Sequence, residues 1–467
     1  MSINNAFNLA STGLSANSQW AEMVSGNIAN ASNDSYGRRS LQMTSTPGGA
    51  AIPTGVARAV DASLTRMYRE ELGRLTRQDS IVAGLAPYTA SLGDLDDPGS
   101  PAQLLTGLQT SLDMLYNDPS DTASQQSAVQ SAQLLARGIR TLAGDLESAM
   151  AEVRISLHSD VGQVNGITED IAQLNGRLAR SAEGSEQRAA LEDQMSEKLN
   201  ALAEFMDYRT EVGANGTVQV LTNSGQRLVE RDTSFEVSYH DGAGTLMVDG
   251  TDISPPRGVT EGRLAAGVEL LNDIMPQMRQ QLDEFAAAVI TSFETTDASL
   301  AAGDPGLFTD DGAAFNAANL TGLAQRLKVN DAVVPEAGGA IWRIRDGMGA
   351  VTEGSAGQSS QIGAFLDALD GPQSFSSATG LPTDVTLSAY TAALIADQHD
   401  TRGQAETERD ALNASAASLD GARLSAQGVN IDDELQQLIL IEKSFAANSQ
   451  VISALADMLD SLLAAAA

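Results

Sequence analysis

The first thirty residues carry apolar or small side chains at the spacing of a coiled coil. From Ile3 onward, such positions recur at alternating intervals of four and three residues, with Asn17 as the one polar member. These positions are Ile3, Phe7, Ala10, Leu14, Asn17, Ala21, Val24, Ile28 and Ala31. Because a heptad repeat of this kind is the seam along which helices pair, the segment predicts a pairing helix.

The last segment of the chain repeats the pattern. Its positions are Leu438, Ile441, Phe445, Asn448, Ile452, Leu455, Leu459 and Leu462, again with a single asparagine. One seam asparagine fixes the register and oligomer state of a coiled coil. We therefore predict a terminal coiled-coil domain, made of residues 1–45 and 427–467, that is disordered in the monomer and orders on assembly. The alternative is two amphipathic helices packed on one globular core.

The middle of the chain changes its period. Residues 123–208 keep a spacing of three to four and predict long helices, whereas residues 211–252 alternate between turn signals such as Asn215-Gly216 and predict a small antiparallel β insertion. Helical spacing returns over residues 261–296, where Pro276 should introduce a kink. Residues 297–382 are rich in Gly, Ala, Asp and Ser and predict irregular structure, and residues 388–426 predict a further helix.

Together these segments predict a mainly α fold with a β insertion, an α+β multidomain protein. We expect an elongated antiparallel helical rod with paired terminal helices. The rod comprises residues 46–208 and 258–426, with a loop-rich segment at about 297–385, and residues 209–257 form a small outer β domain.

Charge excludes one class of partner. The chain has 467 residues with 28 Lys and Arg against 61 Asp and Glu, a formal charge of −33. This field repels phosphates, so the sequence predicts no nucleic-acid binding, and it disfavours an anionic membrane surface. No apolar stretch is long enough to predict membrane insertion. The first basic residue is Arg38, so we expect no secretory signal of the cleaved type and, if the chain is exported, a different route.

The residues that carry enzyme or metal chemistry are scarce. The chain has no cysteine, and its histidines, His158, His240 and His399, are isolated from one another. The acidic groups at 94–97 and 310–312 lack the spacing of an EF-hand loop. We therefore expect no catalytic, cofactor or metal site.

Short motifs at both ends carry a family resemblance. The N-terminal ones are Ser11-Thr12-Gly13-Leu14-Ser15-Ala16, Asn27-Ile28-Ala29-Asn30 and Tyr36-Gly37-Arg38-Arg39; the C-terminal ones are Gly428-Val429-Asn430-Ile431-Asp432-Asp433-Glu434 and Phe445-Ala446-Ala447-Asn448-Ser449-Gln450-Val451-Ile452. Together they resemble the ends of the bacterial flagellar rod, hook and hook-associated proteins. The C-terminal form, the segment Gly262-Arg263-Leu264 and the turn Asp304-Pro305-Gly306-Leu307-Phe308 are most similar to the hook-associated branch.

The resemblance implies a non-enzymatic building block at the hook–filament junction, outside the cell. The terminal helices would form the inner layer of an axial tube. The implied partners are copies of the chain, hook protein, hook-associated protein 3, an export chaperone and the type III export apparatus. The candidate assembly interface is Leu14, Asn17, Val24, Asn27, Ile28, Asn30, Leu438, Ile441, Phe445, Asn448, Ile452, Leu455, Leu459 and Leu462. The family-motif residues are Tyr36, Arg38, Gly428, Val429, Asn430, Asp432 and Glu434.

Two other functions fit the sequence less well. The chain could be another axial protein, either hook protein or hook-associated protein 3. It could also be a secreted calcium-dependent adhesin or enzyme carried on axial-type ends, for which the Gly- and Asp-rich segment 297–382 is the one supporting feature.

Overall fold

A computed structural model describes residues 3–46, 50–213 and 215–466. The predicted domains also include residues 1, 2, 47–49, 214 and 467, which lie outside the described residues. Contacts divide the chain into two compact units. Unit 1 comprises residues 1–77, 159–265 and 409–467, and unit 2 comprises residues 78–158 and 266–408. The predicted domain boundaries and rod shape stay predictions.

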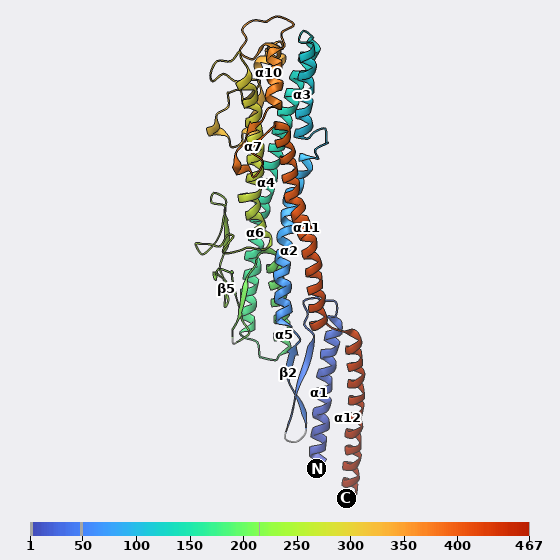
Figure 1. Ribbon diagram of the computed structural model, residues 1–467. Helices are drawn as coiled ribbons and strands as arrows, with labels where there is room; N and C mark the ends of the chain where they lie inside the picture. Colours follow the sequence, from blue (N-terminus) through green and yellow to red (C-terminus); the bar gives the residue numbers. More distant parts are fainter. Residues whose placement is uncertain (1–2, 47–49, 214, 467) are drawn as a thin grey trace. The chain divides into compact units, whose positions relative to one another are not determined.

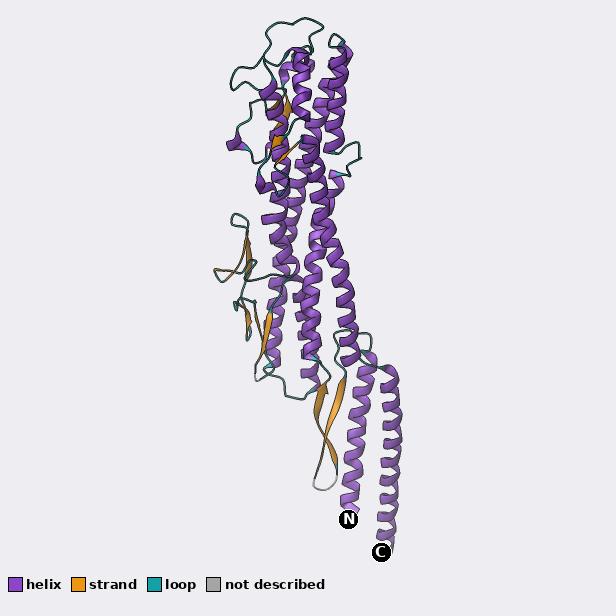
Figure 2. Cartoon of the chain, in the orientation of Figure 1, coloured by secondary structure: helices purple, strands orange, loops and turns teal. Residues whose placement is uncertain are grey.

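Helices dominate both units (Figure 2). The α-helices are α1 (Ile3–Ala29), α2 (Ala62–Leu92), α3 (Pro101–Asn117), α4 (Thr122–Leu178), α5 (Glu186–Phe205), α6 (Gly262–Glu269), α7 (Met275–Thr296), α8 (Leu323–Arg326), α9 (Arg343–Asp346), α10 (Ser360–Asp370), α11 (Leu387–Gln427) and α12 (Ile431–Ala466). A π-helical turn, η1 (Leu270–Ile274), joins α6 to α7, and short 3-10 turns are η2 (Ala317–Asn319), η3 (Asp331–Val333), η4 (Pro335–Ala337) and η5 (Ser377–Thr379).

The strands form small antiparallel sheets. They are β1 (Arg39–Ser45), β2 (Ala51–Arg58), β3 (Arg209–Val212), β4 (Val218–Leu221), β5 (Arg227–Glu230), β6 (Thr233–Ser234), β7 (Val237–His240), β8 (Thr245–Val248), β9 (Thr251–Asp252), β10 (Phe308–Asp310), β11 (Leu327–Val329), β12 (Gln373–Ser374) and β13 (Asp384–Val385). The prediction of a mainly α fold with a β insertion is confirmed.

The predicted interruption at Pro276 takes a specific form. The helix begun by α6 widens into the π-helical turn η1, and Pro276 then falls in the first turn of α7. Proline lacks the N–H that would bond to the preceding turn, so it is tolerated at this place. A π-turn absorbs the misfit without ending the helix.

The core of unit 2 includes a group of aromatic side chains. Phe293 of α7 lies with its ring centre 5.1 Å from that of Phe308 in β10 and 4.9 Å from that of Phe365 in α10. All three side chains are fully buried. The sequence predicted irregular structure with a few short elements in this segment. Helix α10 is longer than predicted, because Ile362, Phe365 and Leu369 line one buried face of it.

The β insertion of unit 1 is held on α4 by two asparagines. The side-chain amide of Asn175 accepts from Val218 N and donates to Val218 O, both at 2.7 Å, and Asn165 bonds Val237 in the same reciprocal way at 2.8 Å. Each amide therefore replaces a neighbouring strand for one residue of β4 or β7. Val218 and Val237 keep both backbone groups satisfied while they pack against a helix.

Replacing Asn175 with alanine should lower the free energy of unfolding by about 2 kcal/mol. The variant leaves the buried backbone groups of Val218 without partners, and unsatisfied groups of this kind cost about 1–3 kcal/mol. Chemical denaturation of the full chain measures the change. Gln173→Ala on the exposed side of α4 is the control, and equal stability of the two variants would contradict the proposed anchoring.

Candidate assembly interface of the terminal helices

Helices α1 and α12 lie side by side in unit 1 and run in opposite directions (Figure 1). We call them the terminal pair. Met23, Val24 and Ile441 form its buried apolar cluster, and Trp20, Ala21, Ile28 and Leu41 pack around it. This cluster is small and lies toward the C-terminal end of α1, while the buried Ala10 and Ala16 continue the covered side of that helix.

Polar contacts continue the interface along the pair. Asn27 Nδ2 donates to Glu434 Oε2 at 3.0 Å, Trp20 Nε1 to Gln437 Oε1 at 3.3 Å, and Asn17 Nδ2 to Ser444 Oγ at 2.9 Å. Farther along, a Cβ atom built on Gly13 would stand 2.9 Å from the side-chain amide of Asn448. Directional bonds of this kind fix the register of two helices more than they stabilise them.

The predicted interface residues differ in how far the terminal pair buries them. Val24 and Ile441 are buried in the cluster, Ile28 packs against it, and Asn17 and Asn27 bond to α12. Leu14, Asn448, Ile452 and Leu455 are half-buried, and Asn30, which follows the end of α1, donates through Nδ2 to Gly26 O of that helix. Leu438, Phe445, Leu459 and Leu462 are exposed, at 36%, 45%, 42% and 57%.

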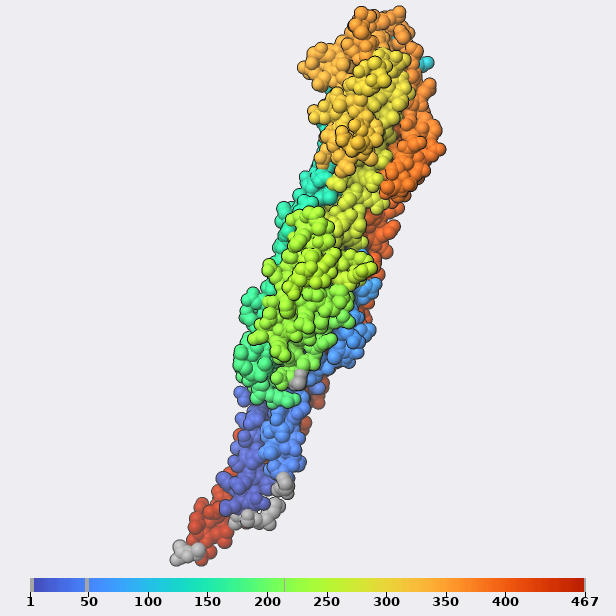
Figure 3. Space-filling view, turned by 90° about the vertical axis from the view of Figure 1, so that its left-hand side faces the viewer, coloured from blue at the N-terminus to red at the C-terminus, as the bar shows by residue number. Residues whose placement is uncertain are grey.

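Helix α12 exposes far more apolar surface than its length suggests. Of the twenty-two exposed large hydrophobic side chains among the described residues, eleven lie on this helix. They are Ile431, Leu435, Leu438, Ile439, Leu440, Phe445, Val451, Met458, Leu459, Leu462 and Leu463. The last turns also extend beyond α1 (Figure 1 and Figure 3).

Five polar residues form one strip along α12, and Asp433, Glu442 and Asp460 are exposed outside it. Asp432, Gln436, Lys443, Gln450 and Asp457 are all exposed and follow each other at intervals of four or seven residues, which places them on one side of a helix. Exposed apolar side chains share the rest of the circumference with these three acids. A helix with apolar side chains on several sides buries them against its partners.

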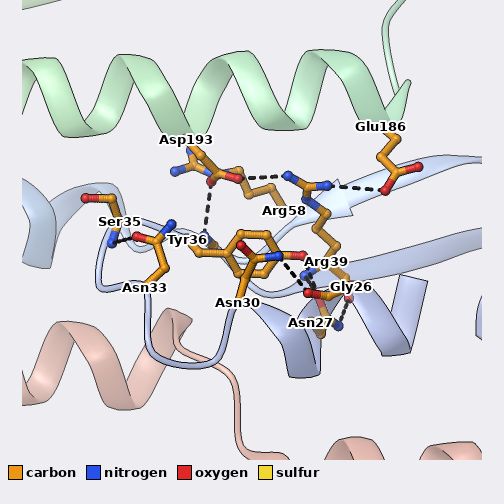
Figure 4. A network of polar contacts seen from close by, with 11 residues as sticks. Gly26, Asn27, Asn30, Asn33, Ser35, Tyr36, Arg39, Arg58, Glu186 and Asp193 are labelled. Atoms are coloured by element: carbon orange, nitrogen blue, oxygen red, sulfur yellow. Dashed lines mark hydrogen bonds and ion pairs between the residues drawn. The ribbon is translucent and has the colours of Figure 1, made fainter. Parts of the chain in front are cut away.

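Asn27 joins the terminal pair to the chain that follows α1. Its Oδ1 accepts from Tyr36 Oη at 2.9 Å and from Arg39 N at 3.0 Å, and its Nδ2 donates to Arg39 O at 2.9 Å (Figure 4). The same Nδ2 donates to Glu434 Oε2. The amide thus reaches β1, the preceding loop and α12 at once. Burial raises the pKa of the Tyr36 hydroxyl, which keeps it protonated and able to donate.

Asp193 of α5 ties the same region to the rest of unit 1. Its carboxylate accepts from Gly37 N at 3.1 Å, Arg39 Nη2 at 3.0 Å and Arg58 Nε at 2.5 Å (Figure 4). The side chain is only 11% exposed. A Cβ on Gly37 would stand 2.7 Å from Arg58 Cγ, so the packing of Arg58 requires glycine at that position.

The remaining motif residues shape the entry into α12. Arg38 N donates to Gln427 O at 2.9 Å, and a Cβ on Gly428 would stand 2.4 Å from Leu424 O. Asn430 Oδ1 accepts from the backbone of Asp432 and Asp433 at 3.0 and 3.4 Å and so caps the helix. Val429 is half-buried and Asp432 exposed, whereas Glu434 is buried against Asn27.

Sequence reasoning missed three residues of this junction, Asp193, Arg58 and Arg423. Arg423 of α11 is almost fully buried, stacks 5.1 Å from the Tyr68 ring centre and donates to Asp34 O at 2.9 Å. One signal could have revealed Asp193. It follows buried Ala189 by four residues, so it is a carboxylate on the apolar face of a helix.

The described ranges contain no helix long and apolar enough to cross a membrane. Within those same ranges, three or more His, Cys, Asp or Glu side chains are nowhere grouped so that they could hold a metal ion.

Comparison with known proteins identifies two matching segments. Residues 96–306 match the family described as "Flagellar hook-associated protein FlgK helical domain". Residues 421–465, which include almost all of α12, match the family described as "Flagellar basal body rod FlgEFG protein C-terminal". Both the body of the chain and its C-terminal helix thus resemble flagellar proteins.

Similar proteins share one name. Flagellar hook-associated protein 1 of Escherichia coli K12 is 24% identical over 62% of this chain and 56% of its own length, and that of Salmonella typhimurium is 26% identical over 61% and 55%. The chain therefore spans little more than half the length of these two relatives. The Bacillus subtilis protein of the same name is 20% identical over 96% of each chain.

Among solved structures, the flagellar hook junction protein FlgK from Burkholderia pseudomallei is 21% identical, with a TM-score of 0.44 over 52% of this chain and 46% of that one. The family matches and the named relatives agree with the resemblance of the terminal motifs. Over residues 96–306 and 421–465 the chain is similar to flagellar hook-associated and basal body rod proteins, and the relatives described above all carry the name flagellar hook-associated protein 1.

Proposed function

We propose that this chain is a structural subunit of the bacterial flagellum, located outside the cell at the junction of hook and filament. The observation that carries the proposal is the apolar surface of α12, which the terminal pair leaves open to solvent. The name of the relatives, flagellar hook-associated protein 1, supplies the setting. The proposal assigns the chain no enzymatic step.

The exposed side chains of α12 provide the driving force for assembly. Fully burying one Leu, Ile, Phe or Met side chain contributes about 1.5–3 kcal/mol. Burial of the eleven exposed side chains of this helix can therefore supply a large favourable free energy of association. Contiguous apolar surface of this kind marks an interaction site. The partners that we propose are further copies of the chain, hook protein and hook-associated protein 3, each covering part of α12 with its own terminal helices.

Delivery to this location follows from the same proposal. The unpaired apolar helix would be shielded by an export chaperone inside the cell and would pass unfolded through the type III export apparatus. The terminal pair then forms its lasting contacts at the growing end, where neighbouring subunits cover the sides of α12 that α1 leaves exposed.

Removal of residues 438–467 should abolish filament attachment. The truncated chain keeps Glu434 and the first turn of α12 but loses Ile441 and nine of the eleven exposed apolar side chains. Cells that carry only this version should make hooks without filaments and release filament protein into the medium. Electron microscopy and motility on soft agar measure the result.

The full-length chain in the same cells is the control. An antibody against it should label one narrow band at the hook–filament boundary. Label along the whole hook would instead support the alternative that the chain is a hook protein. Attached filaments and normal motility in the truncated strain would overturn the proposal.

A further inference from the structure

Unit 1 contains a cavity of about 980 Å³ between α2, α5 and β3. Five arginines line it: Arg58, Arg66, Arg69, Arg74 and Arg209. We call it the arginine cavity. The chain has only 28 basic residues against 61 acidic ones, so this concentration of guanidinium groups stands out against an acidic surface.

Three of the arginines have carboxylate partners. Arg58 bonds Asp193 at 2.5 Å, and Arg74 lies 3.0 Å from Glu71. Arg66 lies 3.9 Å from Glu70, but both side chains are largely exposed, and an exposed pair at this distance binds weakly. Arg58 and Arg74 are therefore neutralised, and Arg66 remains available to a ligand.

Arg69 and Arg209 have no carboxylate partner in the part of the chain that the structure describes. Arg69 donates through Nε to Asn200 Oδ1 at 2.7 Å and through Nη2 to Ser196 at 3.1 and 3.2 Å. Arg209 donates to Asn223 O at 3.0 Å. Burial lowers the pKa of Arg69, as expected for a cation that is withdrawn from water among neutral acceptors.

Four acidic residues share the cavity wall with the arginines: Glu70, Glu192, Asp207 and Glu261. Glu192 pairs with Arg188 at 3.1 Å. Asp207 accepts from the backbone N–H and the hydroxyl of Thr260, both at 2.7 Å. Glu261 lies 4.0 Å from Arg77. Asp207 keeps its charge because these donors are neutral, so the positive charge offered to an incoming group is local to Arg69 and Arg209.

The remaining wall mixes polar side chains, such as Ser196, Thr210 and Asn223, with apolar ones, and the space is large. Leu178, Met195, Leu199 and Val212 line it, and its volume of about 980 Å³ is near the upper end of the roughly 300–1,000 Å³ found for ligand pockets. A ligand that matches this lining carries carboxylates beside apolar side chains. A short acidic stretch of polypeptide has this chemistry.

We propose that the arginine cavity binds an acidic segment of a second copy of this chain. The inference rests on the proposed function, because it requires that copies assemble. A formal charge of −33 makes each copy a source of such segments. The turn at residues 94–97 is an example, since Leu95 is 45% exposed between carboxylates. Charge complementarity between copies then adds specificity to the apolar association of α12.

A photo-crosslinking amino acid at position 212 tests the proposal in the full-length chain. Val212 lines the cavity and is 74% exposed, so the probe should not disturb the fold. Copies labelled with light and heavy isotopes are mixed, assembled and irradiated, and mass spectrometry maps the products. We expect cross-links between copies that end in an acidic segment. About 0.5 M salt should reduce them, since it screens exposed charges.

Two substitutions and a matched control define the role of charge. Arg69→Gln and Arg209→Gln should each reduce the cross-link yield about tenfold, the effect of losing one charge-assisted hydrogen bond. Arg227→Gln removes an arginine from β5 that lies outside the cavity and pairs with Glu230, and it should change nothing. Circular dichroism verifies folding, and the exposed Arg209 provides a test even if Arg69→Gln unfolds.

The outcomes separate this inference from the proposed function. The inference would be overturned if polymers form normally but the probe at position 212 cross-links only within its own copy. It would also be overturned if the cross-links between copies end in segments without acidic residues. Either result would leave the proposed function standing. Equal yields for Arg209→Gln and Arg227→Gln would overturn it too. Failure of the unmodified chain to form polymers at all, measured by sedimentation, would overturn both.

Discussion

Replacing Phe445 with glutamate should abolish assembly and leave the isolated chain as stable as before. Phe445 is 45% exposed on α12, so in the monomer the substitution should change the free energy of unfolding by no more than about 0.5 kcal/mol. In the polymer it removes about 1.5–3 kcal/mol of apolar burial and adds a carboxylate without a partner, which costs at least about 2 kcal/mol more.

Together these losses amount to about 4 kcal/mol or more for each contact, which corresponds to about a thousandfold weaker association. The critical concentration for polymer formation, measured by sedimentation of the purified chain, should rise by that factor. Thermal unfolding of the monomer should stay unchanged.

Gln450→Glu is the matched control because it adds the same charge within the polar strip of α12. It should assemble like the unmodified chain. If Phe445→Glu instead unfolds the monomer, Phe445 belongs to the core of a single chain, and the reading of α12 as an assembly helix is wrong. If both variants assemble normally, the exposed side of α12 is not the interface.

The heptad pattern predicted the two terminal helices but not how each seam residue is used. Ile441 is buried against Met23 and Val24, whereas Phe445, only four residues later, is exposed. Both have the spacing of a seam, because periodicity identifies the apolar face of a helix and not the partner that covers it. Only the position of α1 divides these residues into a covered set and an open one.

Elements that depend on distant partners were harder to predict. The hairpin of β1 and β2 was not expected, since its strands show little alternation and are half-buried or exposed along most of their length. Contacts with residues far away in the sequence hold this hairpin in place. Val56 N donates to Gly184 O at 2.7 Å, and the side chains of Arg39 and Arg58 both donate to Asp193. In the sequence, the place of Asp193 on the apolar face of a helix could have indicated its burial, but nothing local identifies the arginines that it binds.

Replacing Asp193 with alanine should lower the free energy of unfolding of the full chain by about 4 kcal/mol. The carboxylate is the acceptor for two guanidinium groups and one backbone N–H, and its side chain is only 11% exposed. Removing one partner from a buried ion pair costs about 3–5 kcal/mol, because the opposite charge is left without compensation. Chemical denaturation measures the loss.

Glu186→Ala is the matched control, because Glu186 pairs with the same Arg39 at 3.5 Å but is 62% exposed. An exposed pair contributes about 0–1 kcal/mol, so this variant should remain close to the unmodified chain. Comparing the two variants therefore shows whether the stabilisation comes from the burial of the ion pair or only from having a carboxylate near Arg39. Hydrogen exchange should also be faster in β1 and at the end of α1 in Asp193→Ala, since Gly37 and Arg39 lose their acceptor. Equal stability of the two variants would show that the junction is held by packing rather than by Asp193.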